Sequence, residues 1–407
     1  MTARVALVTG AGSGIGLSVA ERLAAQGHVV VLVGRGVPAL ERARAACERV
    51  GGSAMVVPAD VRDAEAVRSA FETAASLGRL DAVVHSAGVL TYGRFEDVPA
   101  EVFEAAIDTT LLGTSRVFRE ALRIFRSSGG GRFVVVGSVL GKVVVPEMSS
   151  YVTAKWGLHG LVRTLQVEHR GDPDVEISLV SPGGVDTPIY RSSGTFSGSH
   201  GRPPEPVAGP DKAADAVMAC LERPRREVDL TWTNHVIVLG SRLLPWLYDA
   251  AVGPLASRVA QQPGSGVEPT AGNVLEPRDV PPEADDPPGS LPVRRTVAAP
   301  ADRVWEVLAD PARLQQWLPG ARVHESEDGR HLVLGAQGAA GPTRVRVEIE
   351  PDDGPSCTVT IRQDVVDGPG RVVPRLARQG AVVVRSTLAL RRLADLAEAP
   401  RRDLGSA

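Results

Sequence analysis

Two side chains capable of acid–base chemistry lie four residues apart at the start of one helical pattern. Tyr151 and Lys155 lie at the start of a helical pattern of apolar residues that extends to His169, so both side chains share one helix face. A phenol has an ordinary pKa of about 10, and a neighbouring ammonium group favours the phenolate and lowers that pKa. We therefore predict that Tyr151 exchanges a proton with a bound oxygen atom. Ser138, at the end of an expected strand, would donate a hydrogen bond to the same oxygen.

A glycine-rich loop follows the first expected strand. Residues 9–16 read Thr-Gly-Ala-Gly-Ser-Gly-Ile-Gly and lead into a helical pattern. Glycines let the backbone approach a pyrophosphate, and a helix N-terminus offers free N–H groups with a partial positive charge. The loop predicts a dinucleotide site. The loop residues that we expect to bind the cofactor are Gly10, Ser13, Gly14, Ile15 and Gly16.

Residues 1 to about 230 resemble the short-chain dehydrogenase/reductase family, because several of its landmarks occur in order. Besides the glycine loop and the triplet Ser138, Tyr151 and Lys155, the chain has Asp60-Val61, Ala87-Gly88, Pro182-Gly183 and Thr187 at the family's positions. The resemblance implies that Ser138, Tyr151 and Lys155 are catalytic and that a hydride passes to or from a nicotinamide.

The same resemblance assigns cofactor contacts. Asp60 and Val61 would lie at the adenine, Tyr151 and Lys155 at the nicotinamide ribose, and Thr187 at the carboxamide. Ala87, Gly88, Pro182 and Gly183 complete the expected cofactor site.

The chain departs from the family pattern at two places. His85-Ser86 replaces Asn-Asn, and Thr110 replaces an Asn that positions a water in the proton relay. Thr110 is therefore a fourth catalytic candidate, and its hydroxyl extends a different distance from the backbone than the Asn side chain of the family.

The choice of cofactor is expected to depend on the end of the second strand. Gly34 stands where an enzyme that selects NAD has an acid, and Arg35 follows it. A guanidinium can bind a 2′-phosphate through two charge-assisted hydrogen bonds. We therefore expect NADP rather than NAD.

The pattern of strands and helices predicts the fold class. Short, nearly continuous apolar runs at 5–9, 29–34, 54–58, 80–85, 132–137, 175–180 and 227–231 alternate with helical patterns. Such runs are typical of a parallel sheet covered on both faces. We predict a doubly wound parallel α/β (Rossmann) domain over 1–260.

Beyond residue 260 the composition changes twice. Residues 261–292 are rich in proline and lack periodicity, which predicts a solvated linker. Residues 293–407 regain alternating strands and a final helical pattern, which predicts a smaller α+β domain with an antiparallel sheet.

The opening of this second domain, with Trp305, Asp310-Pro311 and Trp317, resembles the START-like, polyketide cyclase/dehydrase superfamily. That resemblance implies a helix-grip fold and a cavity for an apolar ligand. We interpret both tryptophans as core residues rather than ligand contacts.

Composition excludes several classes of protein. A net charge of −3 argues against nucleic-acid binding, and no apolar run is long enough to span a membrane. Three scattered cysteines form neither a disulfide framework nor a four-thiolate metal site. We expect a cytoplasmic homo-oligomer that binds no metal.

Two further segments have open interpretations. Residues 188–210, rich in Gly, Ser and Pro, are either a mobile substrate lid or a disordered surface loop. Residues 232–260 are apolar, and we expect core or a subunit interface before a substrate-pocket wall or a membrane-lying segment.

The leading hypothesis is an NADP-dependent oxidoreductase that acts on a bulky, apolar alcohol or carbonyl. One alternative is a bifunctional enzyme whose second domain performs a cyclase or dehydratase step. The other is a non-catalytic protein that binds NADP or another ligand, which the intact Ser138, Tyr151 and Lys155 argue against.

Overall fold

The chain forms two compact units, Met1–Pro282 and Glu283–Ala407. This computed structural model describes residues 3–172, 174–199, 201–204, 207–259, 267–279, 293–327, 331–338, 341–352, 355–365 and 375–398. Each unit is described by itself.

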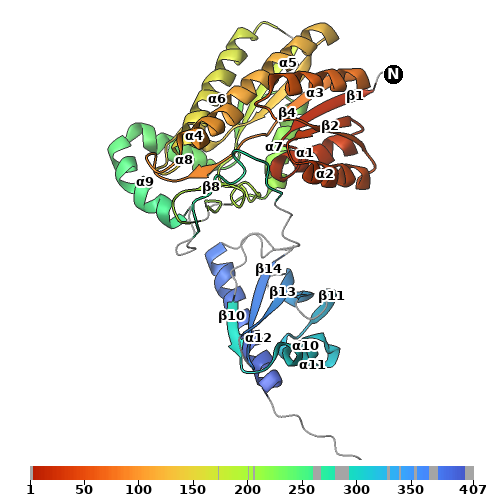
Figure 1. The fold of residues 1–407 in the computed structure, drawn as a ribbon, viewed down its shortest axis with the longest axis vertical. Coiled ribbons are helices and arrows are strands. Elements are labelled where there is room, and N and C mark those ends of the chain that lie inside the picture. The colour runs from red at the N-terminus through yellow and green to blue at the C-terminus, as the bar shows by residue number, and fades with distance from the viewer. Residues whose placement is uncertain are drawn as a thin grey trace, which may run out of the picture. The chain divides into compact units, whose positions relative to one another are not determined.

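The first unit is built on a parallel sheet of seven strands in the order β3-β2-β1-β4-β6-β7-β9 (Figure 1). Every neighbouring pair in this sheet is parallel, as the continuous apolar runs predict. The strands are β1 (Arg4–Thr9), β2 (Val29–Gly34), β3 (Ser53–Pro58), β4 (Arg79–His85), β6 (Gly131–Val136), β7 (Val175–Ser181) and β9 (Glu227–Asp229). The predicted doubly wound Rossmann arrangement is confirmed.

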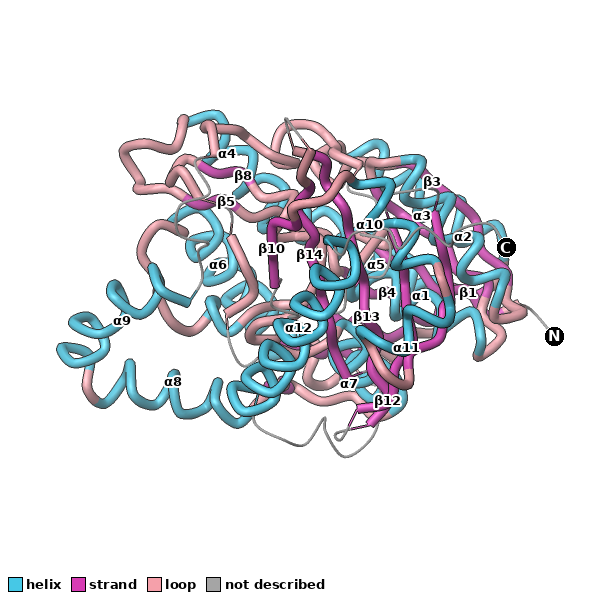
Figure 2. Tube along the Cα trace, turned by 90° about the horizontal axis from the view of Figure 1, so that it is seen from below, coloured by secondary structure: helices cyan, strands magenta, loops and turns pink. Residues whose placement is uncertain are grey.

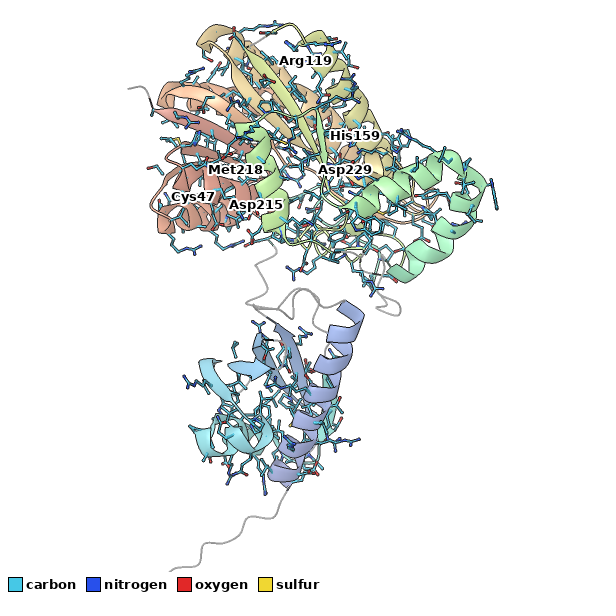
Figure 3. All side chains as sticks on the ribbon, turned by 180° about the vertical axis from the view of Figure 1, so that it is seen from behind. Cys47, Arg119, His159, Asp215, Met218 and Asp229 are labelled. Carbon is cyan, nitrogen blue, oxygen red and sulfur yellow. The ribbon has the colours of Figure 1, made fainter. Side chains whose placement is uncertain are left out.

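Helices cover both faces of this sheet. α1 (Gly14–Ala25), α2 (Val37–Arg49) and α7 (Pro210–Glu222) bury their apolar side chains in one core, which includes the labelled Cys47 and Met218 of Figure 3. α3 (Ala64–Leu77), α5 (Gly113–Ser128) and α6 (Ser149–Glu168) form the core on the opposite face. Burial on both faces explains why the strands lack polar alternation.

Shorter elements lie beyond the carboxyl ends of the strands. α4 (Ala100–Ile107) continues through a π-helical turn, η1 (Asp108–Leu112), directly into α5. A 3₁₀ turn, η2 (Val139–Gly141), follows β6. β5 (Thr91–Tyr92) pairs with β8 (Gly194–Thr195) in a small parallel ribbon.

α8 (Trp232–Leu243) and α9 (Pro245–Val259) form a helical pair that extends beyond the rest of the unit in both ribbon views (Figures 1 and 2). Among the described residues no single helix has the length and apolarity to cross a bilayer. α8 together with Pro245–Gly253 passes that test only as a pair bent by 119°.

The second unit contains the predicted antiparallel sheet. Its strand order is β10-β14-β13-β12-β11, and every neighbouring pair is antiparallel. The strands are β10 (Val293–Val297), β11 (Ala321–Glu327), β12 (His331–Gly338), β13 (Gly341–Pro351) and β14 (Cys357–Val365). The helices are α10 (Ala301–Ala309), α11 (Pro311–Trp317) and α12 (Arg375–Glu398).

The core of the second unit lies between its sheet and its helices. Leu393 and Ala397 of α12 are fully buried against strand residues such as Val347 and Val359. Trp317 is fully buried and Trp305 packs against the same core, which agrees with their interpretation as core residues.

The predicted linker is wrong in part. The division falls after Pro282, and residues 267–279 pack on the first unit, where Thr195 and Thr270 exchange backbone hydrogen bonds of 2.8 and 2.9 Å. Polar groups in residues 267–279 therefore form hydrogen bonds with the rest of the first unit, which the proline content did not indicate. Residues 260–266 and 280–292 lie outside the described part of the chain.

Candidate active site

A cavity of about 650 Å³ opens at the carboxyl ends of β1, β2, β4, β6 and β7. Ligands of open parallel sheets bind at this edge. The residues predicted from sequence that line the cavity are Gly10, Ser13, Gly14, Ile15, Arg35, Asp60, Val61, Ala87, Gly88, Ser138, Tyr151, Lys155, Pro182, Gly183 and Thr187. Gly16 and Thr110 are not among the lining residues.

The glycine loop leaves no room for side chains. Gly10 and Gly14 have φ of 68° and 54°, a region that favours glycine. A Cβ on Gly14 would lie 2.9 Å from the Thr187 side chain. A Cβ on Gly16 would lie 2.2 Å from the carbonyl oxygen of Gly10, so Gly16 permits the close approach of loop and helix. The first turn of α1 carries no acid, and its free N–H groups suit a pyrophosphate.

Ser138, Tyr151 and Lys155 meet at one point of this cavity. Ser138 caps η2 by accepting from the Leu140 N–H at 3.1 Å, and it is hydrogen-bonded to the Tyr151 phenol. Tyr151 and Lys155 lie one turn apart on α6, and the Lys155 ammonium is 5.6 Å from the centre of the Tyr151 ring. Lys155 also donates to the Val136 carbonyl at 3.0 Å. The predicted shared helix face is present.

In the protein by itself, the pKa of Tyr151 shifts in the opposite direction to the lowering expected from the Lys155 ammonium together with an oxidised nicotinamide. Burial raises the pKa of Tyr151 to about 12, against a smaller lowering by its hydrogen bond to Ser138. Burial also lowers the pKa of Lys155 to about 8. The cost of charging a buried phenol therefore exceeds the stabilisation of the phenolate by the hydrogen bond to Ser138, and the phenol is held in its protonated form.

Thr110 does not face the cavity. Its Oγ1 accepts from the Val89 N–H at 3.4 Å, and its carbonyl accepts from the Thr114 hydroxyl at 2.7 Å. The preceding Thr109 lines the cavity instead, is 3% exposed, and its hydroxyl has no hydrogen-bond partner within the described residues. Both threonines lie in the π-helical turn η1, and such turns often occur at functional sites. No sequence signal distinguished Thr109.

His85, the other departure from the family pattern, is structural. It is buried between the hydroxyls of Thr9 and Thr114, with each ring nitrogen 2.8 Å from one of them. Burial, together with the charge of Lys155, lowers the pKa of His85 to about 3. A neutral imidazole therefore connects the end of β1 to α5 below the cavity.

The end of the cavity where Asp60 lies, expected from the resemblance to receive the adenine, contains a cluster of charged side chains. Arg62 binds Asp60 through both Nε at 2.9 Å and Nη2 at 2.7 Å, and Arg35 Nη1 is 3.9 Å from the same carboxylate. Burial would raise the pKa of Asp60, but these hydrogen bonds and charges lower it overall. Arg35, expected to be free for a phosphate, donates to the carbonyls of Asn273 and Val274.

The opposite end of the cavity is apolar. Ile237 of α8, Leu244 between the two helices, and Leu247 and Val252 of α9 line it, so this segment is a pocket wall. The expectation that this segment belongs to the core is wrong, because Trp232 and Trp246 are 75% and 70% exposed. The alternative of a substrate-pocket wall agrees with the cavity lining, and a subunit interface stays a prediction.

The segment after Thr187 is ordered where the structure describes it. Ile189 and Tyr190 line the cavity, and Ser193 and Thr195 are buried beside β5. This segment is a packed cover rather than a disordered surface loop.

Comparison with known proteins identifies the class. Residues 4–197 match the short chain dehydrogenase family. The uncharacterized oxidoreductase YxnA of Bacillus subtilis is 30% identical over 66% of this chain and 77% of its own. Trihydroxynaphthalene reductase of Colletotrichum orbiculare is 33% identical over 46% of this chain and 67% of its own. The chain therefore belongs to the short-chain dehydrogenase family, and it is an oxidoreductase.

A solved structure agrees with the fold. Actinorhodin polyketide ketoreductase with NADPH is 26% identical, with a TM-score of 0.50 over 56% of this chain and 95% of that one. The glycine cradle described above has the shape that a nicotinamide dinucleotide requires, because side chains at Gly10, Gly14 or Gly16 would clash there. The first unit therefore carries a site for NAD or NADP.

Proposed function

We propose that the protein is an NADP-dependent reductase of a bulky, apolar carbonyl compound. One observation carries this proposal. A single cavity joins the glycine cradle, the Ser138–Tyr151–Lys155 cluster and the apolar wall of α8 and α9. Cofactor, proton donor and an apolar substrate would thus meet in one enclosed space.

The protonated phenol of Tyr151 is suited to the reduction of a carbonyl compound. Reduction of a carbonyl needs an acid that delivers a proton to the oxygen, and burial keeps the Tyr151 phenol protonated at neutral pH. Ser138 would orient the carbonyl oxygen through a hydrogen bond. Lys155, which is charged at neutral pH, would hold the nicotinamide ribose. The cofactor, when bound, supplies the hydride.

Preference for NADP is supported by the charge at the adenosine end. Arg35 lines the cavity at the end of β2, and no acid replaces Gly34 beside it. A guanidinium has five N–H donors, so the two bonds of Arg35 to backbone carbonyls leave donors for a phosphate.

The class of substrate is supported by the wall of α8 and α9 and by the relatives. Their names state a trihydroxynaphthalene and a polyketide as substrates of those proteins. We infer that this chain reduces a ketone attached to a fused or extended aromatic framework.

The second unit is proposed to be a helix-grip domain that binds an apolar molecule. A five-stranded antiparallel sheet packed against the long helix α12 supports this assignment. A polar group within that packing, where Gln363 donates to Thr343 at 3.2 Å and Ser386 approaches Gln363 at 3.4 Å, could orient the polar end of such a ligand.

The test is turnover of NADPH with a panel of carbonyl compounds. Aromatic ketones of two or three fused rings are expected to be reduced faster than acetone or short aldehydes, and NADPH is expected to be preferred to NADH. Equal rates on small and fused-ring ketones would contradict the proposed substrate class. Light scattering of the full chain would test the expected homo-oligomer.

A further inference from the structure

A segment outside the part of the chain that matches the family crosses the cofactor cavity. We call residues Thr270–Asp279 the strap. Val274 in its middle is fully buried in a small core with Val89 and Val102, so the strap is anchored by apolar packing. Its Asn273 side chain donates to the Ser192 hydroxyl at 3.1 Å. The family match ends at residue 197 and therefore assigns no role to the strap.

Three arginines of the Rossmann fold hold the strap. Arg35 donates to the Asn273 and Val274 carbonyls, and Arg62 donates to the Leu275 carbonyl at 2.9 Å. Arg42 on α2 forms an ion pair with Asp279. Arg35 and Arg62 also surround Asp60, which fixes the position of the strap beside the adenosine end of the site.

The strap contributes its own side chains to the cavity. Asn273, Pro277 and Arg278 line it together with Arg35 and Asp60. Arg278 donates a hydrogen bond to the Thr270 hydroxyl at 2.9 Å. Because this hydroxyl is neutral, the hydrogen bond does not compensate the positive charge of Arg278. Two acids of this network have other partners, because Asp60 binds Arg62 and Asp279 binds Arg42.

We propose that the strap closes the adenosine end of the cofactor site, and that Arg278 is a specificity-determining residue that binds the 2′-phosphate of NADP. This inference rests on the proposed NADP-dependent function. Arg35 donates two hydrogen bonds to the strap, so a dianionic phosphate would gain from a second guanidinium that lines the same cavity. Arg278 is that guanidinium, presented by a segment that the other arginines fix.

The experiment compares cofactor affinities of the full-length protein by calorimetry. Arg278→Ala is expected to weaken NADP⁺ binding about 10-fold or more, since a hydrogen bond to a charged group is lost, and to change NAD⁺ binding less than about twofold. Arg278→Lys keeps the charge and is expected to recover most of the NADP⁺ affinity.

Arg49→Ala is the matched control for charge. Arg49 lies at the far end of α2 with its side chain 74% exposed and does not line the cavity. Its removal is expected to leave both affinities unchanged. A second variant, Arg42→Ala, releases the Asp279 carboxylate next to Arg278 and is expected to weaken NADP⁺ binding more than NAD⁺ binding, whereas equal losses would contradict phosphate binding by Arg278.

The outcomes separate this inference from the proposed function. If the wild type prefers NADP⁺ and Arg278→Ala keeps the preference, the assignment of Arg278 is wrong while the proposed function stands. Equal losses for both cofactors in Arg278→Ala would likewise reject phosphate recognition. A wild type that binds both cofactors equally would overturn the NADP preference and this assignment together. Specific NADP⁺ binding without carbonyl reduction would contradict only the proposed reaction.

Discussion

Replacing Tyr151 by phenylalanine removes the proposed acid while keeping the aromatic ring. General acid catalysis typically contributes about 10²–10⁴-fold to a rate, so kcat for carbonyl reduction is expected to fall about 1,000-fold. The ring of Tyr151 still packs beside Lys155, whose ammonium lies 5.6 Å from its centre, so NADPH affinity is expected to change little. Tyr248→Phe is the comparison, because it removes a phenol from the apolar wall and is expected to alter KM rather than kcat.

The pH dependence of the wild type tests the same reasoning. Burial raises the pKa of Tyr151 from 10.0 to about 12, which corresponds to about 3 kcal/mol in favour of the phenol. The acid therefore stays protonated across the neutral range, and reduction is expected to be independent of pH between about pH 6 and 7. Because the pKa of Lys155 is lowered to about 8, its charge is lost as the pH rises through that value, and reduction is expected to decline there. Oxidation of the alcohol needs the phenolate and is expected to speed up with rising pH.

The assay is the absorbance of NADPH during turnover, with cofactor affinity measured separately. More than a tenth of wild-type kcat in Tyr151→Phe would refute the role of the phenol as the acid. A reduction rate that increases steadily from about pH 6 to 8 would contradict the proposal that the protonated Tyr151 phenol donates the proton.

Three further predictions concern other parts of the first unit. Thr109→Val is expected to lower kcat about 10-fold without lowering Tm, because Thr109 lines the cavity and its buried hydroxyl has no partner among the described residues; unchanged kcat would exclude a role in positioning the reacting groups. Gly16→Ala is expected to cost about 1–3 kcal/mol of stability, measured by thermal unfolding, since its Cβ would lie 2.2 Å from the Gly10 oxygen; an unchanged Tm would mean that α1 shifts freely. A chain cut after Pro282 is expected to keep NADPH binding and the reduction of small ketones. A chain cut after residue 260 lacks the strap and is expected to lose NADPH affinity. Equal NADPH affinity of the two truncated chains in a binding assay would contradict this.

The sequence predicted the first fold well because its signals are local. Continuous apolar runs such as 29–34 form strands inside the sheet, and the glycines of residues 10–16 are recognisable from their spacing directly after the first strand. The spacing of Tyr151 and Lys155 on one helix is equally local. In the second unit α11 and β11 were not predicted, because the short helix 311–317 and the polar strand 321–327 have weak periodicity.

The remaining features depend on contacts between distant parts of the chain. Residues 267–279 look like a linker by composition, yet hydrogen bonds from Arg35 and Arg62, more than 200 positions earlier, order them. The pKa of Tyr151 is likewise set by how completely the surrounding helices and loops bury it, which the Tyr–Lys spacing does not encode. The pocket wall of residues 232–260 was only the second alternative from the sequence for the same reason, since the periodicity of α8 does not tell which neighbour its faces meet.

The π-helical turn between α4 and α5 has a consequence for how this chain tolerates length changes. Such a turn holds one residue more than an α-helical turn, and it absorbs that residue without rotating the helix that follows. α5 therefore keeps Val117, Phe118 and Phe125 directed into the core, and the Thr114 hydroxyl satisfies the Thr110 carbonyl within the widened turn. Removing one residue from 108–112 would restore a regular helix in the same phase. Deletion of one residue there would thus leave the surrounding fold unchanged and change only which side chain of the turn lines the cavity.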